Sequence, residues 1–452
     1  MIKTKILGSI ALTAILALGI SGCSGGGGDT ETLGGTTTTQ TEATGISAAN
    51  KTIALTTYAN IALANYTDAL YDASNLNTAL DTFVSSPNDT TLQAAKNAWK
   101  SARISYGTTE IFRLADGPID AAEGFAATFG APEGQLNAWP LDENMIDYTT
   151  AASGAVTSGN IIDTVGVFTP SGSEATSVDV TTITKETLSA LNENGGDANI
   201  ATGYHAVEFL LWGQDQDYNS FLDDTITNGA TTAGLRNVTD YTSAANADRR
   251  KDYLVAASEL IVDDLQLMVD AWTSVTGSYR EAFLASGSNA IATNTALKQI
   301  FISMGTFVKS ELANERMAVA ILTPSEEDEH SCFSDNTHVD VDKNYRGFVN
   351  VLKGEYKGSL QGTSFYSLLP QTNKDTLDTF ISSIETKITA MNNAVTSEHF
   401  DYQIKDGSSN KDNLVSIKNE LRELGDEMVT VATEFDISLS TDDVTDADET
   451  QL

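Results

Sequence analysis

The chain has 452 residues, of which 41% are hydrophobic, so it is long enough to bury a sizeable core and to form about two domains. Its 26 basic and 62 acidic residues give a net charge of -36, which argues against nucleic acid or an anionic membrane surface as a direct partner and suits the attraction of cations. With 7 prolines and many Ala, Leu and Thr runs, the composition favours helices over a turn-rich β-fold.

The first 22 residues predict an export signal. Lys3 and Lys5 precede the short apolar run ILGSIALTAILALGI, and the sequence Ile-Ser-Gly-Cys follows, ending at Cys23. This ending resembles a bacterial lipobox, so we expect residues 1–22 to be removed and Cys23 to be lipidated. Because Ser24 is not an acidic retention signal, the expected location is the cell envelope, anchored by lipid to the outer membrane and facing the periplasm or the surface.

The remaining chain divides by composition into a tether, a helical region and a tail. Residues 23–46 are rich in Gly and Thr and predict a flexible tether, whereas residues 439–452 form an acidic tail that we expect to be solvated. Between them we predict an all-α fold of two helical bundles. The predicted bounds are 47–240 and 245–438, with Arg249 and Arg250 near the start of the second bundle.

Two predicted helices change from apolar to charged near one end. In the first, helical spacing connects Leu92, Ala95, Trp99, Ala102 and Tyr106, and then reaches Glu110 and Arg113. In the second, the same spacing connects Leu297, Phe301, Met304 and Val308, and then reaches Glu311 and Glu315. We interpret this parallel as a weak internal duplication. The alternative is that the three glutamates simply lie at the solvated ends of their helices.

The stretch GYHAVEFLLWGQD, residues 203–215, predicts a nearly buried helix that carries two ionisable side chains. His205 and Glu208 are three residues apart and share one face with Trp212. A buried carboxylate needs a cation, a metal or a raised pKa. The motif alone leaves two readings open, a metal site and a satisfied His–Glu pair in the core.

Together with its neighbours, this motif resembles the imelysin family of bacterial envelope proteins, and in particular the iron-regulated branch. The stretch matches the G-x-H-x-x-E signature, and the similarity covers roughly residues 50 to 435. Further similar stretches are GPID at 117–120, NAWPLDENMIDY at 137–148, ELANERM at 311–317 and EDEHSCFSDNTH at 327–338. The resemblance implies two bundle-like helical domains with a site at their interface.

The resemblance also implies which residues belong to that site. His205 and Glu208 match the signature, and Gly203 allows a close approach of the backbone just before them. Two loops are implied as well. The first contains Asn137, Trp139, Pro140 and Asp142, and the second contains Glu329, His330, Ser331, Cys332, Asp335 and Asn336.

We predict that the site binds a metal ion or a metal chelate. The predicted ligands are His205, Glu208, Glu110, Glu311 and Glu315, with Arg113 in the cleft beside them. One imidazole with several carboxylates favours iron, with zinc and calcium as the other candidates. The expected role is iron uptake by a membrane-anchored lipoprotein, with iron-uptake proteins as partners.

Two other functions stay open at this point. A metallopeptidase is implied by the label of the family, but none of the 4 histidines falls in an H-E-x-x-H or H-x-x-E-H motif. If Glu208 binds metal, another carboxylate such as Glu110 or Glu311 would have to be the general base. The third candidate is recognition of a polysaccharide or a protein by a groove that exposes Trp139. A nucleophilic role for the Cys332 thiol is disfavoured.

Overall fold

The computed structural model describes residues 45–150, 155–215, 233–322, 324 and 328–447. Cys23, the predicted signal segment and nearly all of the predicted tether lie outside these residues. Helices make up 61% of the structure and strands 3%, so the predicted all-helical class is confirmed. None of the helices in the described ranges is both long and apolar enough to cross a bilayer.

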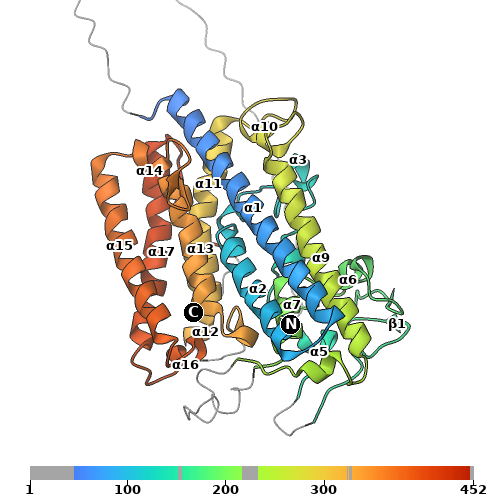
Figure 1. The fold of residues 1–452 in the computed structure, drawn as a ribbon. Coiled ribbons are helices and arrows are strands. Elements are labelled where there is room, and N and C mark those ends of the chain that lie inside the picture. Colours follow the sequence, from blue (N-terminus) through green and yellow to red (C-terminus); the bar gives the residue numbers. More distant parts are fainter. Residues whose placement is uncertain (1–44, 151–154, 216–232, 323, 325–327, 448–452) are drawn as a thin grey trace, which may run out of the picture. The chain divides into compact units, whose positions relative to one another are not determined.

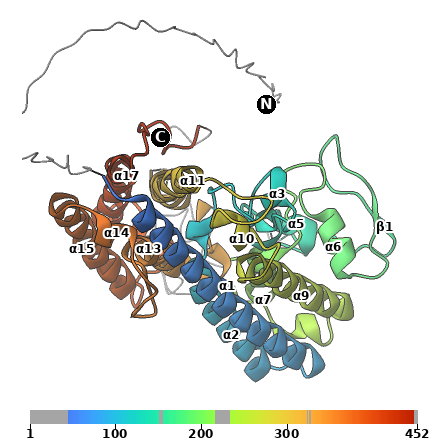
Figure 2. The same ribbon diagram turned by 90° about the horizontal axis from the view of Figure 1, so that it is seen from above.

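A first group of helices packs around the GYHAVEFLLW segment. It comprises α1 (Ala48–Ser85), α2 (Asp89–Gly107), α7 (Gly203–Trp212) and α9 (Ala247–Trp272). Figures 1 and 2 both show α1 lying beside α2 and α9. The predicted apolar stripe of α2 is buried, because Trp99 and Tyr106 have almost no exposed surface. The α-helix ends before the stripe reaches Glu110, which lies instead in the 3-10 helix η1 (Glu110–Phe112).

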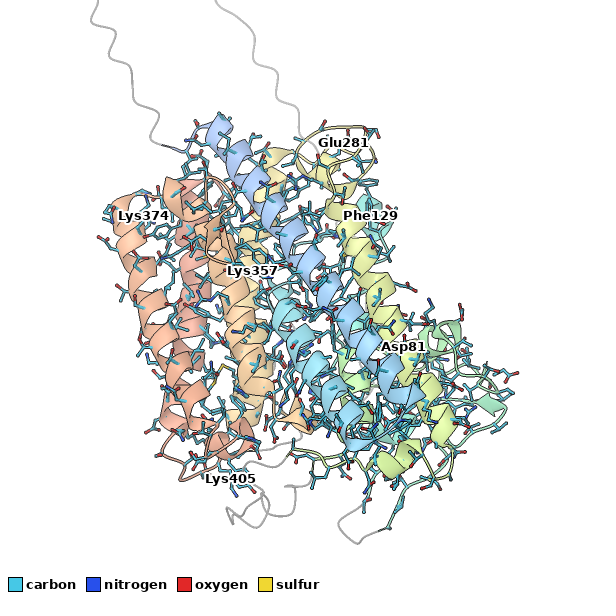
Figure 3. The ribbon with its side chains drawn as sticks, in the orientation of Figure 1. Asp81, Phe129, Glu281, Lys357, Lys374 and Lys405 are labelled. Carbon is cyan, nitrogen blue, oxygen red and sulfur yellow. The ribbon has the colours of Figure 1, made fainter. Side chains whose placement is uncertain are left out.

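A second group of helices packs around α17 (Lys411–Glu434). Helices α11 (Thr293–Thr306), η4 (Phe307–Ala318, a π-helix) and α15 (Gln371–Ala394) pack on it. Helix α13 (Thr337–Lys353) joins the group through its contacts with α15 and η4. In Figure 3, Lys374 marks the start of α15 and Lys405 lies at the opposite end of this group. Gly425 allows α17 to approach its neighbours closely, since a Cβ there would lie 2.6 Å from Cβ of Lys309 and 2.7 Å from the carbonyl oxygen of Gly305.

The winding of the chain changes at Phe307, where α11 passes into the π-helix. The sequence predicts one continuous α-helical stripe through this region. The apolar part of that stripe is confirmed, because Leu297, Phe301, Met304 and Val308 are all buried. Hydrogen bonds in a π-helix connect residues five apart. Glu311 and Arg316 therefore become neighbours, which α-helical spacing does not predict.

Helix α13 connects the two groups, because it packs on α2 of the first and on η4 of the second. Its Gly347 lies against the end of α2, where an added Cβ would come within 2.7 Å of the carbonyl oxygen of Thr108. By its contacts with α1 and α7, helix α9 belongs to the first group. The division into bundles at 47–240 and 245–438 stays a prediction.

Most residues in the described part of the acidic tail are exposed, and Val444 is an exception. Val444 is buried against α11, where it lies within 2.7 Å of the position of a Cβ on Gly305. The backbone N–H of Asp446 donates a hydrogen bond of 2.9 Å to Oγ of Ser310. These residues therefore pack on the second group of helices.

The remaining elements are short and mostly lie in the connections between the long helices. They are α3 (Gly124–Ala127), α4 (Glu133–Leu136), α5 (Glu143–Ile146), β1 (Val167–Phe168), β2 (Val178–Asp179), α6 (Lys185–Leu191), η3 (Val238–Tyr241), α10 (Tyr279–Phe283), α12 (Val319–Leu322), η6 (Cys332–Ser334), β3 (Glu355–Tyr356), β4 (Ser359–Leu360), α14 (Phe365–Leu368) and α16 (Phe400–Ile404). The strands form two antiparallel pairs, β1 with β2 and β3 with β4.

Candidate functional site

A cleft of about 370 Å³ lies between segments from the two halves of the sequence. Residues between 113 and 197 line one side, and residues between 311 and 330 line the other. Seven of the predicted site residues line this cleft, namely Arg113, Asn137, Trp139, Pro140, Glu311, Glu315 and His330. The structure therefore brings together the predicted Trp139 loop, the charged end of the second stripe and the predicted His330 loop.

The cleft carries an excess of negative charge. Its carboxylates are Glu133, Glu193, Asp197, Glu311, Glu315 and Asp328, and its guanidinium groups are Arg113 and Arg316. Six negative and two positive charges leave four negative charges when all of these groups are ionised. Burial and the nearby Arg316 lower the pKa of His330 to about 4, so this histidine is neutral at pH 7. The field of the cleft therefore attracts cations.

Two arginines hold the predicted carboxylates Glu110 and Glu311. Nη2 of Arg316 donates to Oε2 of Glu110 at 2.5 Å and to Oε1 of Glu311 at 2.7 Å. Nη1 of Arg113 lies 2.9 Å from the same oxygen of Glu311 and 3.4 Å from Glu110. Burial alone would raise the pKa of each glutamate, but Arg113 and Arg316 lower both below their usual range. Glu110 is 1% exposed, so it does not lie at a solvated helix end.

The predicted His–Glu pair lies on α7, behind the cleft. Nδ1 of His205 is 3.0 Å from Oε2 of Glu208, and neither side chain is exposed. Oε1 of Glu208 accepts hydrogen bonds from Ser334, at 3.0 Å from its backbone N–H and 2.6 Å from its hydroxyl. Burial lowers the pKa of His205 well below 6.5 and raises the pKa of Glu208 to about 8. Burial therefore disfavours the charged form of both side chains.

Gly203 starts α7 with a φ of +83°, a conformation that favours glycine. A Cβ at this position would lie 2.5 Å from the carbonyl oxygen of Leu136, at the end of α4. The predicted close approach at Gly203 is thus confirmed, and it brings the start of α7 against the loop that contains Trp139.

A second buried network holds His330. Its Nδ1 lies 2.9 Å from Oδ2 of Asp340 on α13, and the hydroxyl of Ser331 donates to the same oxygen at 2.5 Å. Arg103 on α2 donates to Oδ1 of Asp340 from Nε at 3.2 Å and from Nη2 at 3.0 Å, and it also contacts Asn137. Burial alone would raise the pKa of Asp340, but Arg103 and the hydrogen bonds from His330 and Ser331 lower it far below its usual range.

Ring contacts connect the two histidine networks. The rings of His205 and His330 meet edge to face with centroids 4.8 Å apart. Trp139 packs on His205 at 4.9 Å and on Phe333 at 5.7 Å. His205 therefore lies against both His330 and Trp139, which themselves line the cleft.

The other predicted loop residues do not line the cleft. Asp335 pairs with His399, Glu329 and Asn336 are buried, and Asp142 immediately precedes α5. Cys332 is also buried. The structure thus places only His330 of the second predicted loop in the wall of the cleft.

Sequence reasoning missed the buried residues Arg103, Arg316, Ser334 and Asp340, and also the cleft carboxylates Glu133, Glu193, Asp197 and Asp328. Arg103 had a usable signal, because it is four residues after Trp99 and three before Tyr106, on the buried side of α2. A charged residue in such a position needs a buried partner. Ser334 and Asp340 carry no comparable signal, since their roles depend on contacts between distant segments.

The predicted metal ligands do not form one cluster of side chains. Glu110 and Glu311 surround Arg316, whereas His205 and Glu208 bond to each other. In the described ranges, no three His, Cys, Asp or Glu side chains are placed to hold one ion. Among the predicted metal ligands, the Nε2 atom of His205 is buried and has no hydrogen-bond partner. Metal binding by these residues stays a prediction.

Comparison with known proteins decides the family. Residues 62–428 match the imelysin family, peptidase M75. The chain belongs to the imelysin family. Among its relatives, iron-regulated protein A of Synechococcus elongatus is 24% identical over 315 residues, which cover 69% of this chain and 66% of that protein. The match therefore spans slightly less than two thirds of the relative, and the resemblance seen in the sequence is confirmed.

Solved structures confirm the imelysin-like fold. A crystal structure from Parabacteroides distasonis, described as an iron-regulated protein A precursor, superposes with a TM-score of 0.60 at 16% identity, covering 87% of this chain and 97% of that one. An imelysin-like protein from Psychrobacter arcticum gives a TM-score of 0.54 at 14% identity, covering 87% and 98%. At these identities the likeness shows the fold alone.

The raised pKa of Glu208 predicts a pH dependence of stability. The folded protein holds this proton more tightly than the unfolded chain, in which the pKa is near 4.5, so raising the pH toward and beyond 8 favours unfolding through this group. Gln cannot titrate. The Glu208→Gln variant should therefore not lose stability in this way. When the free energy of unfolding is measured in urea, we expect the variant to become more stable relative to the unaltered protein as the pH rises from about 5 to about 9. Glu186→Gln, which changes an exposed carboxylate, is the control. If the stability of both variants relative to the unaltered protein stayed constant over this pH range, the raised pKa of Glu208 would be contradicted.

Proposed function

We propose that this imelysin-family protein binds a positively charged iron species as cargo in the acidic cleft. The observation that carries the proposal is the charge of that cleft, where six carboxylates face two arginines and a neutral His330. The segments that line it come from both halves of the sequence, which fits the predicted site between two bundles.

The cargo is proposed to be a hydrated or partly chelated ion rather than a bare one. A bare ion needs several preorganised ligands, and the described residues offer no set of three. Water or a small chelator would therefore supply the remaining donors. Carboxylates with one imidazole suit iron, and the names of two similar proteins refer to regulation by iron. Zinc and calcium are the competing ions to test.

The binding proposal predicts that the purified protein takes up Fe²⁺ under anaerobic conditions, measured by competition with a chromogenic chelator. Glu315 lines the cleft and is exposed at its edge. Because removal of one unit charge near a cation costs about 1 kcal/mol even in water, Glu315→Gln is expected to weaken binding by about fivefold. Glu186→Gln, which changes an exposed carboxylate in a different groove, is expected to leave the affinity unchanged.

Equal affinities for the two variants would contradict the cleft as the binding site, and absence of uptake by the unaltered protein would contradict the function itself. The same samples distinguish the peptidase alternative. Metal-dependent cleavage of peptides that Glu208→Gln abolishes would replace the binding proposal with an enzymatic one.

We further propose that the protein is anchored to the outer membrane through lipidated Cys23, with iron-uptake proteins as its partners in the envelope. The contiguous basic start, apolar run and Ile-Ser-Gly-Cys sequence support this proposal. Cys23→Ser is expected to move the protein from the membrane fraction to a soluble or unprocessed form. An unmodified mature cysteine in the unaltered protein, by mass spectrometry, would contradict the anchor.

A further inference from the structure

The hydrogen bonds around Asp340 determine which ring nitrogen of His330 carries the proton. Asp340 is 1% exposed, and each of its two oxygens accepts two hydrogen bonds. Oδ1 accepts from two nitrogens of Arg103, and Oδ2 accepts from Ser331 and faces Nδ1 of His330 at 2.9 Å. A carboxylate paired with a guanidinium in this way is ionised and can only accept. Nδ1 of His330 therefore carries the hydrogen.

A neutral imidazole with its hydrogen on Nδ1 has a lone pair on Nε2. No hydrogen bond among the described residues uses Nε2 of His330, and the side chain lines the cleft. The nitrogen that remains available to a ligand in the cleft is therefore an unprotonated one. A histidine oriented by a carboxylate through its other nitrogen is a common arrangement at metal sites.

The neighbouring His205 is placed differently. Its Nδ1 faces Oε2 of Glu208, whose other oxygen already accepts two hydrogen bonds from Ser334. The His205 side chain has no exposed surface and does not line the cleft. Its ring packs against Trp139 and His330, which do line the cleft. A ligand in the cleft therefore meets His330 rather than His205.

We propose that His330, rather than His205, is the imidazole that coordinates the metal of the cargo. Asp340 and Arg103 are positioning residues that keep Nε2 of His330 unprotonated and available to a ligand in the cleft. This inference rests on the proposed function and narrows the class of cargo. The metal must have at least one exchangeable position open to an imidazole, so an aquo ion or a partly chelated ion fits, whereas an ion fully enclosed by a hexadentate chelator does not.

The tautomers can be measured without any metal. In ¹⁵N-detected NMR of the full, metal-free chain at pH 7, assigned through His330→Gln, we expect His330 to carry hydrogen on Nδ1 and none on Nε2. A protonated Nε2 on His330 would overturn the inference whether or not the protein binds iron.

Coordination is tested by X-ray absorption of the Fe²⁺-loaded protein, in which one imidazole is expected around iron. His330→Gln is expected to remove that imidazole and to weaken Fe²⁺ binding by at least about tenfold. His205→Gln and His338→Gln are expected to keep the imidazole, and thermal melting checks that each variant folds. Iron bound without imidazole in the unaltered protein, or loss of imidazole in His205→Gln alone, would overturn the role of His330 and leave the proposed function standing. No bound iron at all would overturn both.

Discussion

Buried arginines that connect distant segments hold this site together. Arg103 of α2 reaches Asp340 of α13, and Arg316 of η4 reaches Glu110 of η1 and contacts Asn344 of α13. The partners in the Arg103–Asp340 and Arg316–Glu110 pairs are more than 200 residues apart in the sequence. Removing one partner of a buried ion pair typically costs about 3–5 kcal/mol, because the other charge is left without compensation. The chain is therefore strongly restrained to the arrangement in which the Trp139 loop, the π-helix and the His330 loop meet.

The same pairs separate the carboxylates of the site into two kinds. Glu110, Glu133 and Glu311 pair with Arg113 and Arg316, so their charges are largely neutralised within the protein. The others leave the cleft negative as a whole. A cation entering it meets attractive charge at its edge, and it meets His330, whose proton position is already determined by Asp340. In the proposed mode of binding, attraction and coordination are therefore performed by different residues.

Much of this arrangement could be predicted from the sequence where local spacing determines it. The burial of Trp99 and Tyr106, the helix that carries His205 and Glu208, and the close approach at Gly203 all follow from apolar periodicity and from the residue types. The meeting of the Trp139 and His330 loops was predicted through the resemblance to the imelysin family. Such features depend on neighbours within one or two helical turns or on a whole-chain pattern.

The rest depends on packing between distant segments and on a change of helical winding. The π-helix makes Glu311 and Arg316 neighbours, whereas an α-helical stripe groups Glu311 with Glu315. No spacing rule connects Arg103 to Asp340, so the residues that orient His330 were not found from the sequence. The prediction named His205 and Glu208, together with Glu110, Glu311 and Glu315, as metal ligands, because local spacing makes these residues conspicuous in the sequence.

The most direct measurement is anomalous X-ray diffraction at the iron edge from crystals of the Fe²⁺-loaded protein. We predict one strong peak in the cleft beside Nε2 of His330, within reach of Glu311 or Glu315. A peak between His205 and Glu208, or iron bound only outside the cleft, would contradict the central claim that the acidic cleft and the oriented His330 together receive the metal.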